Sequence, residues 1–298
     1  MRRESFLAAL ETGQAGSGSV IVADGAMGTM LQEAGLPSGT PPEGWLLENA
    51  EAVRQVHRAY IDAGSDLILT CTFGATRPRL ERSGLSDRLS EINRRAVEIA
   101  REAAGDEVFV AGDIGPTGEL LEPLGALSYE EAVEVFAEQA EALARAGVDV
   151  LYIETMSALD EAKAAVEGAL QAANGTPVTA TLSFDSHGRT SMGVRPEEAA
   201  ETLNKRGVQA LGANCGKSFD MTLEAVEAMG RVTPDMPLIV KPNAGTPRMV
   251  EGEVVYDATP ADMADYARQY VARGARIVGG CCGSTPDHIA AIARAVRS

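Results

Sequence analysis

The sequence predicts a single-domain (β/α)₈ barrel that spans residues 1–298. Eight short apolar runs alternate with amphipathic segments from residue 20 to the end of the chain. The runs are almost continuous in Val, Ile and Leu, which is typical of parallel strands covered on both faces. A length of 298 residues also fits a barrel of about 250 residues with insertions. A doubly wound open sheet is the alternative that periodicity alone leaves open.

Each expected strand is followed by an expected helix, which is the repeat of a βα unit. The apolar runs lie at 20–25, 66–73, 108–113, 149–155, 178–184, 210–215, 237–245 and 276–283. The amphipathic segments lie at 48–63, 87–104, 128–147, 158–173, 195–207, 219–232, 259–274 and 285–298. The glycine-rich stretch at 13–19 is expected to be an N-terminal loop.

Local signals mark where several of these helices begin and end. Ser128 and Glu131 have the spacing of a capping box before a helix. Glycines close four of the amphipathic segments, as left-handed helix C-caps require; they are Gly64, Gly147, Gly207 and Gly274.

Charge and cysteine content narrow the class of protein. A net charge of −17 argues against nucleic-acid binding, because phosphate backbones attract basic surfaces. The N-terminus lacks the apolar core of a secretory signal, and no stretch approaches the roughly 18 apolar residues of a membrane span. We therefore expect a cytoplasmic protein, in which the four cysteines stay reduced and indicate metal binding or catalysis rather than disulfides.

Three of the cysteines stand where a barrel enzyme holds its active site. Cys215 ends the sixth run, and Cys281 and Cys282 end the eighth, so all three thiols are expected at the C-terminal rim of the barrel. Because adjacent residues of a strand point to opposite faces, both members of the pair can reach one metal only if the backbone leaves strand geometry. The surrounding glycines permit this. Cys71, inside the second run, is interpreted as a small buried hydrophobe.

Three thiolates with one open position are typical of a catalytic Zn²⁺ site, since structural zinc sites usually have four protein ligands. Zinc lowers the pKa of a bound thiol enough to deprotonate it at neutral pH. Three cysteinates leave the site negative, so a bound substrate thiolate stays electron-rich and can attack a methyl group. The residues therefore predict a zinc enzyme that methylates a thiol.

The motif GGCCGSTPDHI at 279–289 resembles the zinc signature of the homocysteine S-methyltransferase family. Other motifs similar to that family follow in the same order along nearly the whole chain: DGAMGTML (24–31), TCTFGAT (70–76), GDIGPTG (112–118), IET (153–155), GANC (212–215) and PNAG (242–245). The resemblance implies a barrel enzyme that converts L-homocysteine to methionine.

The resemblance also implies roles for individual residues. It assigns Cys215, Cys281 and Cys282 to zinc, with Asn243 as a fourth ligand in the substrate-free site. The acids Asp24 and Glu154 would hold the substrate ammonium group. Backbone around Thr72, Phe73 and Gly74 would receive the substrate carboxylate.

Two classes of methyl donor stay open. One is a small sulfonium compound such as S-methylmethionine, and the other is methylcobalamin carried by a separate corrinoid protein. The methionine-synthase-like motifs favour the second class. Gly74 stands where the betaine-dependent enzyme carries tyrosine, which disfavours betaine, and Cys71 stands where methionine synthase modules usually carry asparagine. His187 lies in the loop after the fifth strand and is a candidate for donor recognition.

Three alternative functions stay open at this point. The acceptor could be another small thiol. Lys241, near the end of the seventh run, could instead form a Schiff base in a barrel lyase. The cysteines could also make a non-catalytic zinc or thiol sensor.

Overall fold

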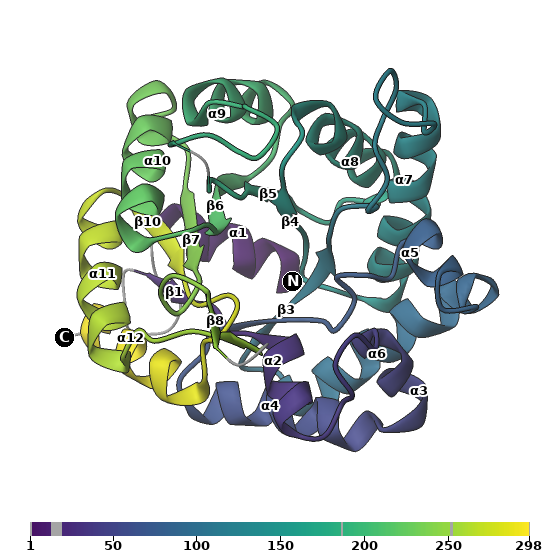
Figure 1. Cartoon of the computed structure of the whole chain (residues 1–298), viewed down its shortest axis with the longest axis horizontal. Coiled ribbons are helices and arrows are strands. Elements are labelled where there is room, and N and C mark those ends of the chain that lie inside the picture. Colours follow the sequence, from purple (N-terminus) through teal and green to yellow (C-terminus); the bar gives the residue numbers. More distant parts are fainter. Residues whose placement is uncertain (1, 13–19, 186, 251–252, 298) are drawn as a thin grey trace.

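The computed structural model describes residues 2–12, 20–185, 187–250 and 253–297, so the expected loop at 13–19 lies outside the described residues. Eight parallel strands form a barrel in the order β1-β10-β7-β6-β5-β4-β3-β2 (Figure 1). They are β1 (Ile21–Val22), β2 (Leu67–Leu69), β3 (Phe109–Ile114), β4 (Val150–Met156), β5 (Val178–Leu182), β6 (Ala210–Cys215), β7 (Leu238–Pro242) and β10 (Ala275–Val278).

The two ends of this sheet meet, which confirms the barrel and excludes the open sheet. Ala23 forms a parallel bridge with Leu67 across β1 and β2. The Asp66 N–H donates to the carbonyl of Val22 at 2.7 Å, and the Asp24 N–H donates to the carbonyl of Leu67 at 3.0 Å. Closure removes the exposed edges that an open sheet would leave.

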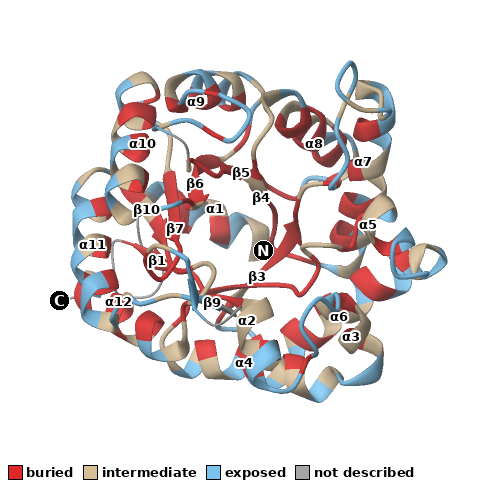
Figure 2. Cartoon of the chain, in the orientation of Figure 1, coloured by how far each residue is buried: buried red, intermediate tan, exposed pale blue. Residues whose placement is uncertain are grey.

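Helices surround the barrel and bury one face each. In Figure 2 the strands form a buried ring, and the surrounding helices are buried toward it and exposed on the outside. The longer helices that cover the ring are α4 (Ala50–Asp62), α6 (Leu89–Ala104), α7 (Tyr129–Ala146), α8 (Leu159–Ala172), α9 (Pro196–Lys205), α10 (Phe219–Val232), α11 (Pro260–Ala272) and α12 (Pro286–Arg297). Shorter helices are α2 (Met27–Glu33), α3 (Trp45–Glu48) and α5 (Arg77–Glu81), with single 3₁₀ turns at η1 (Pro42–Gly44) and η2 (Ser86–Arg88).

The predicted helix boundaries are confirmed where they had a chemical signal. Ser128 and Glu131 form a reciprocal capping box at the start of α7. The helix-ending glycines are left-handed, with φ of 102° at Gly64, 95° at Gly147 and 83° at Gly207. A residue with a Cβ would be strained at these positions, so each glycine allows the chain to turn into the next strand.

The N-terminal helix α1 (Arg2–Thr12) closes the end of the barrel opposite the active rim, a role that the sequence analysis did not anticipate (Figure 1). Phe6 is completely buried and packs edge-on against Phe109, with ring centroids 5.5 Å apart. The same cluster includes Ile21, Leu67 and Ile277 from the inner face of the barrel. This apolar plug keeps water out of the base of the barrel.

Two further features differ from the sequence expectation. The run at 66–73 forms a strand only over Leu67–Leu69, because the chain turns at Thr70 to line the barrel mouth. The long loop before α11 contains a two-stranded hairpin, β8 (Arg248–Val250) and β9 (Glu253–Val255). Within the described residues no helix is both long and apolar enough to cross a membrane.

Candidate metal and substrate site

A layer of charged side chains caps the apolar interior of the barrel. Inward-facing residues alternate along each strand, and Ala111, Tyr152 and Ile239 belong to the inner apolar cluster. Two residues further along the same strands stand Asp113, Glu154 and Lys241. All three are buried and line a cavity of about 420 Å³ at the C-terminal rim.

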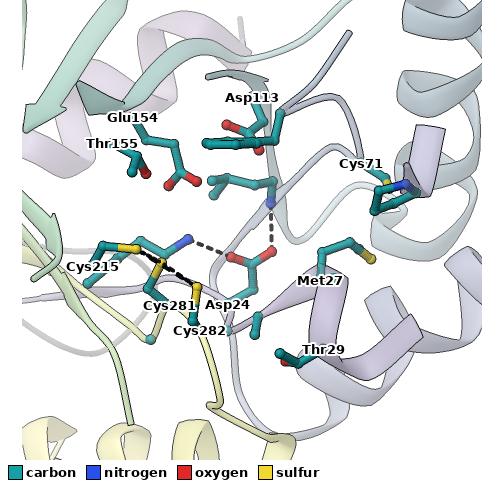
Figure 3. A pocket seen from close by; sticks show the side chains of 18 of the residues that line it. Asp24, Met27, Thr29, Cys71, Asp113, Glu154, Thr155, Cys215, Cys281 and Cys282 are labelled. Atoms are coloured by element: carbon teal, nitrogen blue, oxygen red, sulfur yellow. Dashed lines mark hydrogen bonds and ion pairs between the residues drawn. The ribbon is translucent and has the colours of Figure 1, made fainter. Parts of the chain in front are cut away.

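The three predicted cysteines converge at this cavity (Figure 3). Cys215 comes from the last position of β6, and Cys281 and Cys282 follow β10. The Sγ atoms of Cys215 and Cys282 are 3.9 Å apart, those of Cys281 and Cys282 4.0 Å, and those of Cys215 and Cys281 3.1 Å. The structure therefore brings together thiols that are 66 residues apart in the chain.

The backbone leaves strand geometry at Cys215 and also at the pair Cys281 and Cys282. Cys215 is left-handed at φ 56°, and Gly283, directly after the pair, is left-handed at φ 76°. A Cβ at Gly280 would lie 2.3 Å from Oγ of Ser284, so only glycine fits there. This confirms the prediction that glycines allow Cys281 and Cys282 to leave strand geometry. The strained backbone of Cys215 was not predicted from the sequence.

Asn214 holds the strained segments in place, and sequence reasoning missed it. Its Oδ1 accepts hydrogen bonds from the Thr155 N–H at 2.8 Å and from Thr181 Oγ1 at 2.7 Å, and its Nδ2 donates to Thr155 Oγ1 at 2.6 Å. The backbone of Thr155 is also in the left-handed region, with φ of 61°. Asn214 thus joins the end of β4, next to Glu154, to the residue before Cys215. Its place in the motif GANC beside a predicted ligand was the signal available.

The donor set fits a tetrahedral zinc ion. Zn–S bonds of about 2.3 Å place tetrahedral sulfurs about 3.8 Å apart, close to two of the three separations, while the third pair is closer. Asn243 Nδ2 donates to the carbonyl of Gly216 at 2.9 Å, whereas its Oδ1 is buried without a partner among the described residues. Asn243 is not among the residues that line the cavity, and its role as a fourth ligand stays a prediction.

Hydrogen bonds within the cluster favour the ionised form of one thiol. Those from Cys215 and Cys281 lower the pKa of Cys282 well below its usual range, and the Tyr256 hydroxyl also donates to Cys282. The same hydrogen bonds raise the pKa of Cys215 above its ordinary value. Three clustered thiols next to buried carboxylates are thus arranged for a cation.

Asp24 and Glu154, the predicted ammonium ligands, both line the cavity. Asp24 already has partners: its Oδ1 accepts from Lys241 Nζ at 2.9 Å, and its Oδ2 accepts from the Leu69 N–H at 2.8 Å. Burial alone would lower the pKa of Lys241, but the negative charges of Asp24 and its neighbours raise it above the ordinary value. A lysine that stays protonated and ion-paired is a poor Schiff-base nucleophile, which disfavours the lyase alternative.

Phe73 lines the cavity, whereas Thr72 and Gly74 are not among its lining residues. The Thr72 N–H donates to the carbonyl of Thr70 at 2.9 Å. The Gly74 N–H donates to Oε1 of Glu43 at 2.6 Å. The amide that was predicted to bind the substrate carboxylate is therefore already hydrogen-bonded to a carboxylate of the protein. Burial raises the pKa of Glu43. Recognition of a substrate carboxylate by the Gly74 amide therefore stays a prediction that requires Glu43 to move.

The remaining candidates lie apart from the metal cluster. Cys71 is buried, 4% exposed, and burial raises the pKa of its thiol well above its usual range, as expected of a small hydrophobe. His187 is exposed in the loop after β5 and does not line the cavity. The two other histidines, His57 in α4 and His288 in α12, are also buried, and neither lines the cavity.

Comparison with known proteins agrees with this site. The sequence profile described as homocysteine S-methyltransferase matches residues 21–296. The methionine synthase of Mycobacterium leprae is 32% identical over 295 residues, which cover 93% of this chain and 24% of that protein. Betaine–homocysteine S-methyltransferase 1 of Bos taurus is 35% identical over 302 residues, which cover 93% of this chain and 72% of that protein. The chain thus spans about a quarter of the length of the methionine synthase that it matches.

A solved structure is similar over its full length. The metallated form of the homocysteine methyltransferase MmuM from Escherichia coli superposes with a TM-score of 0.80 and 28% identity, and the alignment covers 99% of both chains. Its oxidized form superposes with a TM-score of 0.76 at 31% identity, covering 92% of this chain and 94% of that one. A similar structure over the same length has therefore been obtained in a metallated form.

Proposed function

The chain belongs to the homocysteine S-methyltransferase family, and we propose that it transfers a methyl group to the thiol of L-homocysteine to form methionine. The convergence of Cys215, Cys281 and Cys282 at the rim of a cavity lined by buried carboxylates carries the proposal. The cysteines supply a site for the substrate sulfur, and the acids supply a site for the ammonium group of an amino acid.

The protein activates the substrate by holding its sulfur at the cysteine cluster. Cys215, Cys281 and Cys282 would hold Zn²⁺, which when bound would lower the pKa of a substrate thiol at the open position enough to deprotonate it at neutral pH. The three cysteinates would carry more negative charge than the ion neutralises and would keep the substrate sulfur electron-rich. The buried walls of the cavity exclude water from the reacting sulfur and orient it.

The transfer itself is a substitution at the methyl carbon. The substrate sulfur donates an electron pair to that carbon as the bond between the methyl group and the donor breaks, and the thiol proton is released to solvent. A sulfonium donor such as S-methylmethionine leaves as a neutral thioether. Methylcobalamin on a corrinoid protein leaves as cob(I)alamin, which keeps the electron pair. We retain both donor classes, since the cavity is lined by residues suited to the acceptor.

Two other functions are less well supported. Methylation of a different small thiol would use the same cysteines but leave the buried acids without a purpose. A zinc or thiol sensor would not need the cavity of about 420 Å³ that adjoins the cluster. The acidic lining therefore favours an amino-acid thiol as substrate.

The test is methionine formation by the zinc-loaded protein from L-homocysteine, with S-methylmethionine and methylcobalamin offered in parallel. We expect one zinc per chain and turnover with at least one donor. Replacement Cys282→Ala should abolish both zinc binding and turnover. Replacement Cys71→Ala serves as the control for metal content, because Cys71 lies outside the cluster and the variant should keep one zinc per chain. Bound zinc without methylation by either donor would contradict the proposal.

A further inference from the structure

Residues 70–76 form one wall of the cavity, although they belong to no helix or strand. The strand β2 ends at Leu69, and α5 begins at Arg77. From the stretch between them, which we call the wall segment, Thr70, Cys71 and Phe73 line the cavity. A segment outside regular secondary structure opens easily unless other groups hold it. The shape of this wall therefore depends on its partners elsewhere in the chain.

Two threonine hydroxyls fix the first half of the wall segment to β3. The register between β2 and β3 covers Leu67–Leu69. Beyond it, the Asp113 N–H donates to Thr70 Oγ1 at 3.0 Å, and Thr72 Oγ1 donates to the Asp113 carbonyl at 2.7 Å. The two hydroxyl oxygens are 2.7 Å apart. The hydroxyls thus continue the link to β3 past the end of the β2 ladder.

Two amide side chains from the surrounding helices hold the wall segment from outside. Gln139 in α7 donates from Nε2 to the carbonyl of Thr72 at 2.8 Å. Asn93 in α6 donates from Nδ2 to the carbonyl of Ala75 at 3.2 Å and to that of Leu89, in its own helix, at 2.9 Å. The two amides also meet, with 3.3 Å between Gln139 Nε2 and Asn93 Oδ1. They therefore act on the wall segment as one unit.

Gln139 and Asn93 are completely buried polar side chains that do not reach the cavity. Both are 0% exposed, and neither is among the lining residues. Burying an amide costs free energy unless its hydrogen bonds are made, whereas an apolar side chain of similar size would fill the same space without that cost. The Oε1 atom of Gln139 even lacks a partner among the described residues. What the two amides contribute is therefore their hold on the wall segment.

A third carbonyl of the wall segment is held by the backbone that follows β3. The Gly115 N–H donates to the carbonyl of Phe73 at 3.1 Å. A Cβ at Gly115 would lie 2.5 Å from that oxygen and 2.6 Å from the ring of Phe73, so only glycine allows this approach. The carbonyls of Thr72, Phe73 and Ala75 are thus all bonded by groups outside the segment.

We propose that Gln139 and Asn93 are positioning residues, which hold residues 70–76 in the shape to which the thiol substrate binds. They act through the wall segment and do not touch the substrate. A wall that is already ordered does not have to be ordered when a ligand arrives, so the ligand binds more tightly. The inference rests on the proposed function for the identity of the ligand.

The first test measures the wall segment itself and needs no substrate. Cys71 is a reporter within the segment, because its buried thiol reacts only when the segment opens. The zinc-loaded protein is treated with iodoacetamide, and alkylation of Cys71 is followed by peptide mass spectrometry. Gln139→Met keeps the length of the side chain but removes the donor, and should speed this alkylation by about tenfold to a hundredfold. An unchanged rate would overturn the inference.

Gln209→Met is the matched control, because it makes the same chemical change at the opposite end of the barrel. Gln209 precedes β6, where its Oε1 accepts from the Val178 N–H at 2.7 Å and its Nε2 donates to the carbonyl of Gly207 at 2.8 Å. The control should alkylate Cys71 within about threefold of the wild-type rate. Equal acceleration in both variants would reflect a general loss of stability and would overturn the inference.

Asn93→Ala is a milder variant that keeps the test decisive if Gln139→Met does not fold. It removes the bond to Ala75 and leaves the bond from Gln139 to Thr72 in place. Alkylation of Cys71 should be faster than in Gln209→Met and slower than in Gln139→Met. A rate equal to that of Gln209→Met would overturn the role of the amide pair.

The second test measures what the wall segment does for the ligand. Homocysteine binding to the zinc-loaded protein is measured by calorimetry without a methyl donor, and zinc affinity by competition with a chelator. Gln139→Met should weaken homocysteine binding by about tenfold and leave zinc affinity within about threefold. In turnover, KM for homocysteine should rise by a similar factor, while kcat changes less. An equal loss of zinc affinity would show that the amides support the whole rim, which would overturn the inference.

The two tests separate the inference from the proposed function. Faster alkylation of Cys71 in Gln139→Met, with no homocysteine binding by the wild-type protein, would support the hold on the wall segment and contradict the proposed function. Turnover of homocysteine with equal KM in the wild-type protein and in Gln139→Met would support the proposed function and overturn the inference.

Discussion

Lys241 and Asp24 form a buried ion pair across the rim of the barrel, with 2.9 Å between Nζ and Oδ1. Lys241 is in β7, whereas Asp24 follows β1, and β10 lies between those two strands. Asp24 also accepts a hydrogen bond from the Leu69 N–H in β2. The ion pair therefore links β1 to β7, and the hydrogen bond from Leu69 links Asp24 across the closure of the barrel to β2.

Replacing Lys241 alone should destabilise the fold. The variant Lys241→Met leaves Asp24 buried without its counter-ion, which costs about 3–5 kcal/mol of unfolding free energy. The paired variant Lys241→Met/Asp24→Asn should cost less than the single one, because no uncompensated charge remains. Urea unfolding monitored by Trp45 fluorescence measures both. A single variant that loses less than about 1 kcal/mol would show that the pair is not structural.

His57 should make the fold sensitive to acid. Burial lowers its pKa to about 4, and neither ring nitrogen has a partner among the described residues. Because the unfolded chain titrates near 6.5, unfolding takes up a proton below that pH, and stability falls as the pH drops from about 6.5 toward 4. Between pH 7 and 5 the wild-type protein should lose about 2 kcal/mol more than His57→Leu.

The comparison with His57→Leu isolates this histidine, because other titrating groups contribute equally to both proteins. Unfolding by urea at a series of pH values measures it. Parallel pH profiles for the two proteins would mean that His57 is accessible to protons in the folded state.

Gly283 should be required for the metal site rather than for a turn alone. A Cβ there would lie 2.2 Å from Cγ of Tyr256, whose hydroxyl donates to Cys282. Gly283→Ala should therefore displace Tyr256 and weaken zinc binding in a competition with a chromophoric chelator. Gly274→Ala is the matched control, since Gly274 is also left-handed, at φ 95°, but has open space around its Cβ position.

The two glycine variants should share a backbone penalty of about 1–2 kcal/mol for left-handed geometry. Gly274→Ala should keep the zinc affinity of the wild-type protein. Equal zinc affinity in Gly283→Ala would mean that the contact with Tyr256 does not position Cys282.

Asn214 should act through the ligand next to it. Asn214→Ala removes the hydrogen bonds that hold Thr155 and the left-handed Cys215 in place. Loss of such supporting contacts typically reduces metal affinity by about tenfold to a hundredfold. Asn204→Ala, at an exposed position of α9, is the control and should leave zinc affinity unchanged. Wild-type zinc affinity in Asn214→Ala would contradict this role.

The sequence by itself predicted the barrel, with an open sheet as the alternative, and the three cysteines that the structure brings together. Eight apolar runs of strand length, each followed by an amphipathic helix, are compatible with few folds other than a parallel barrel. Cys215, Cys281 and Cys282 could be brought together on paper because the ends of parallel strands in a barrel share one rim. The helix ends at Ser128 and Gly147 followed from local hydrogen bonding and backbone sterics.

Only the tertiary structure decided which charged groups neutralise one another. Asp24 meets Lys241, and Glu43 meets the Gly74 amide, across distances in the chain that no local pattern encodes. Asp113 lies next to Glu154 because of the register between β3 and β4. The energy of a buried charge depends on neighbours within a few ångströms, and those neighbours come from other strands. The sequence could therefore supply the candidate charged residues, while packing determined which partners each of them meets.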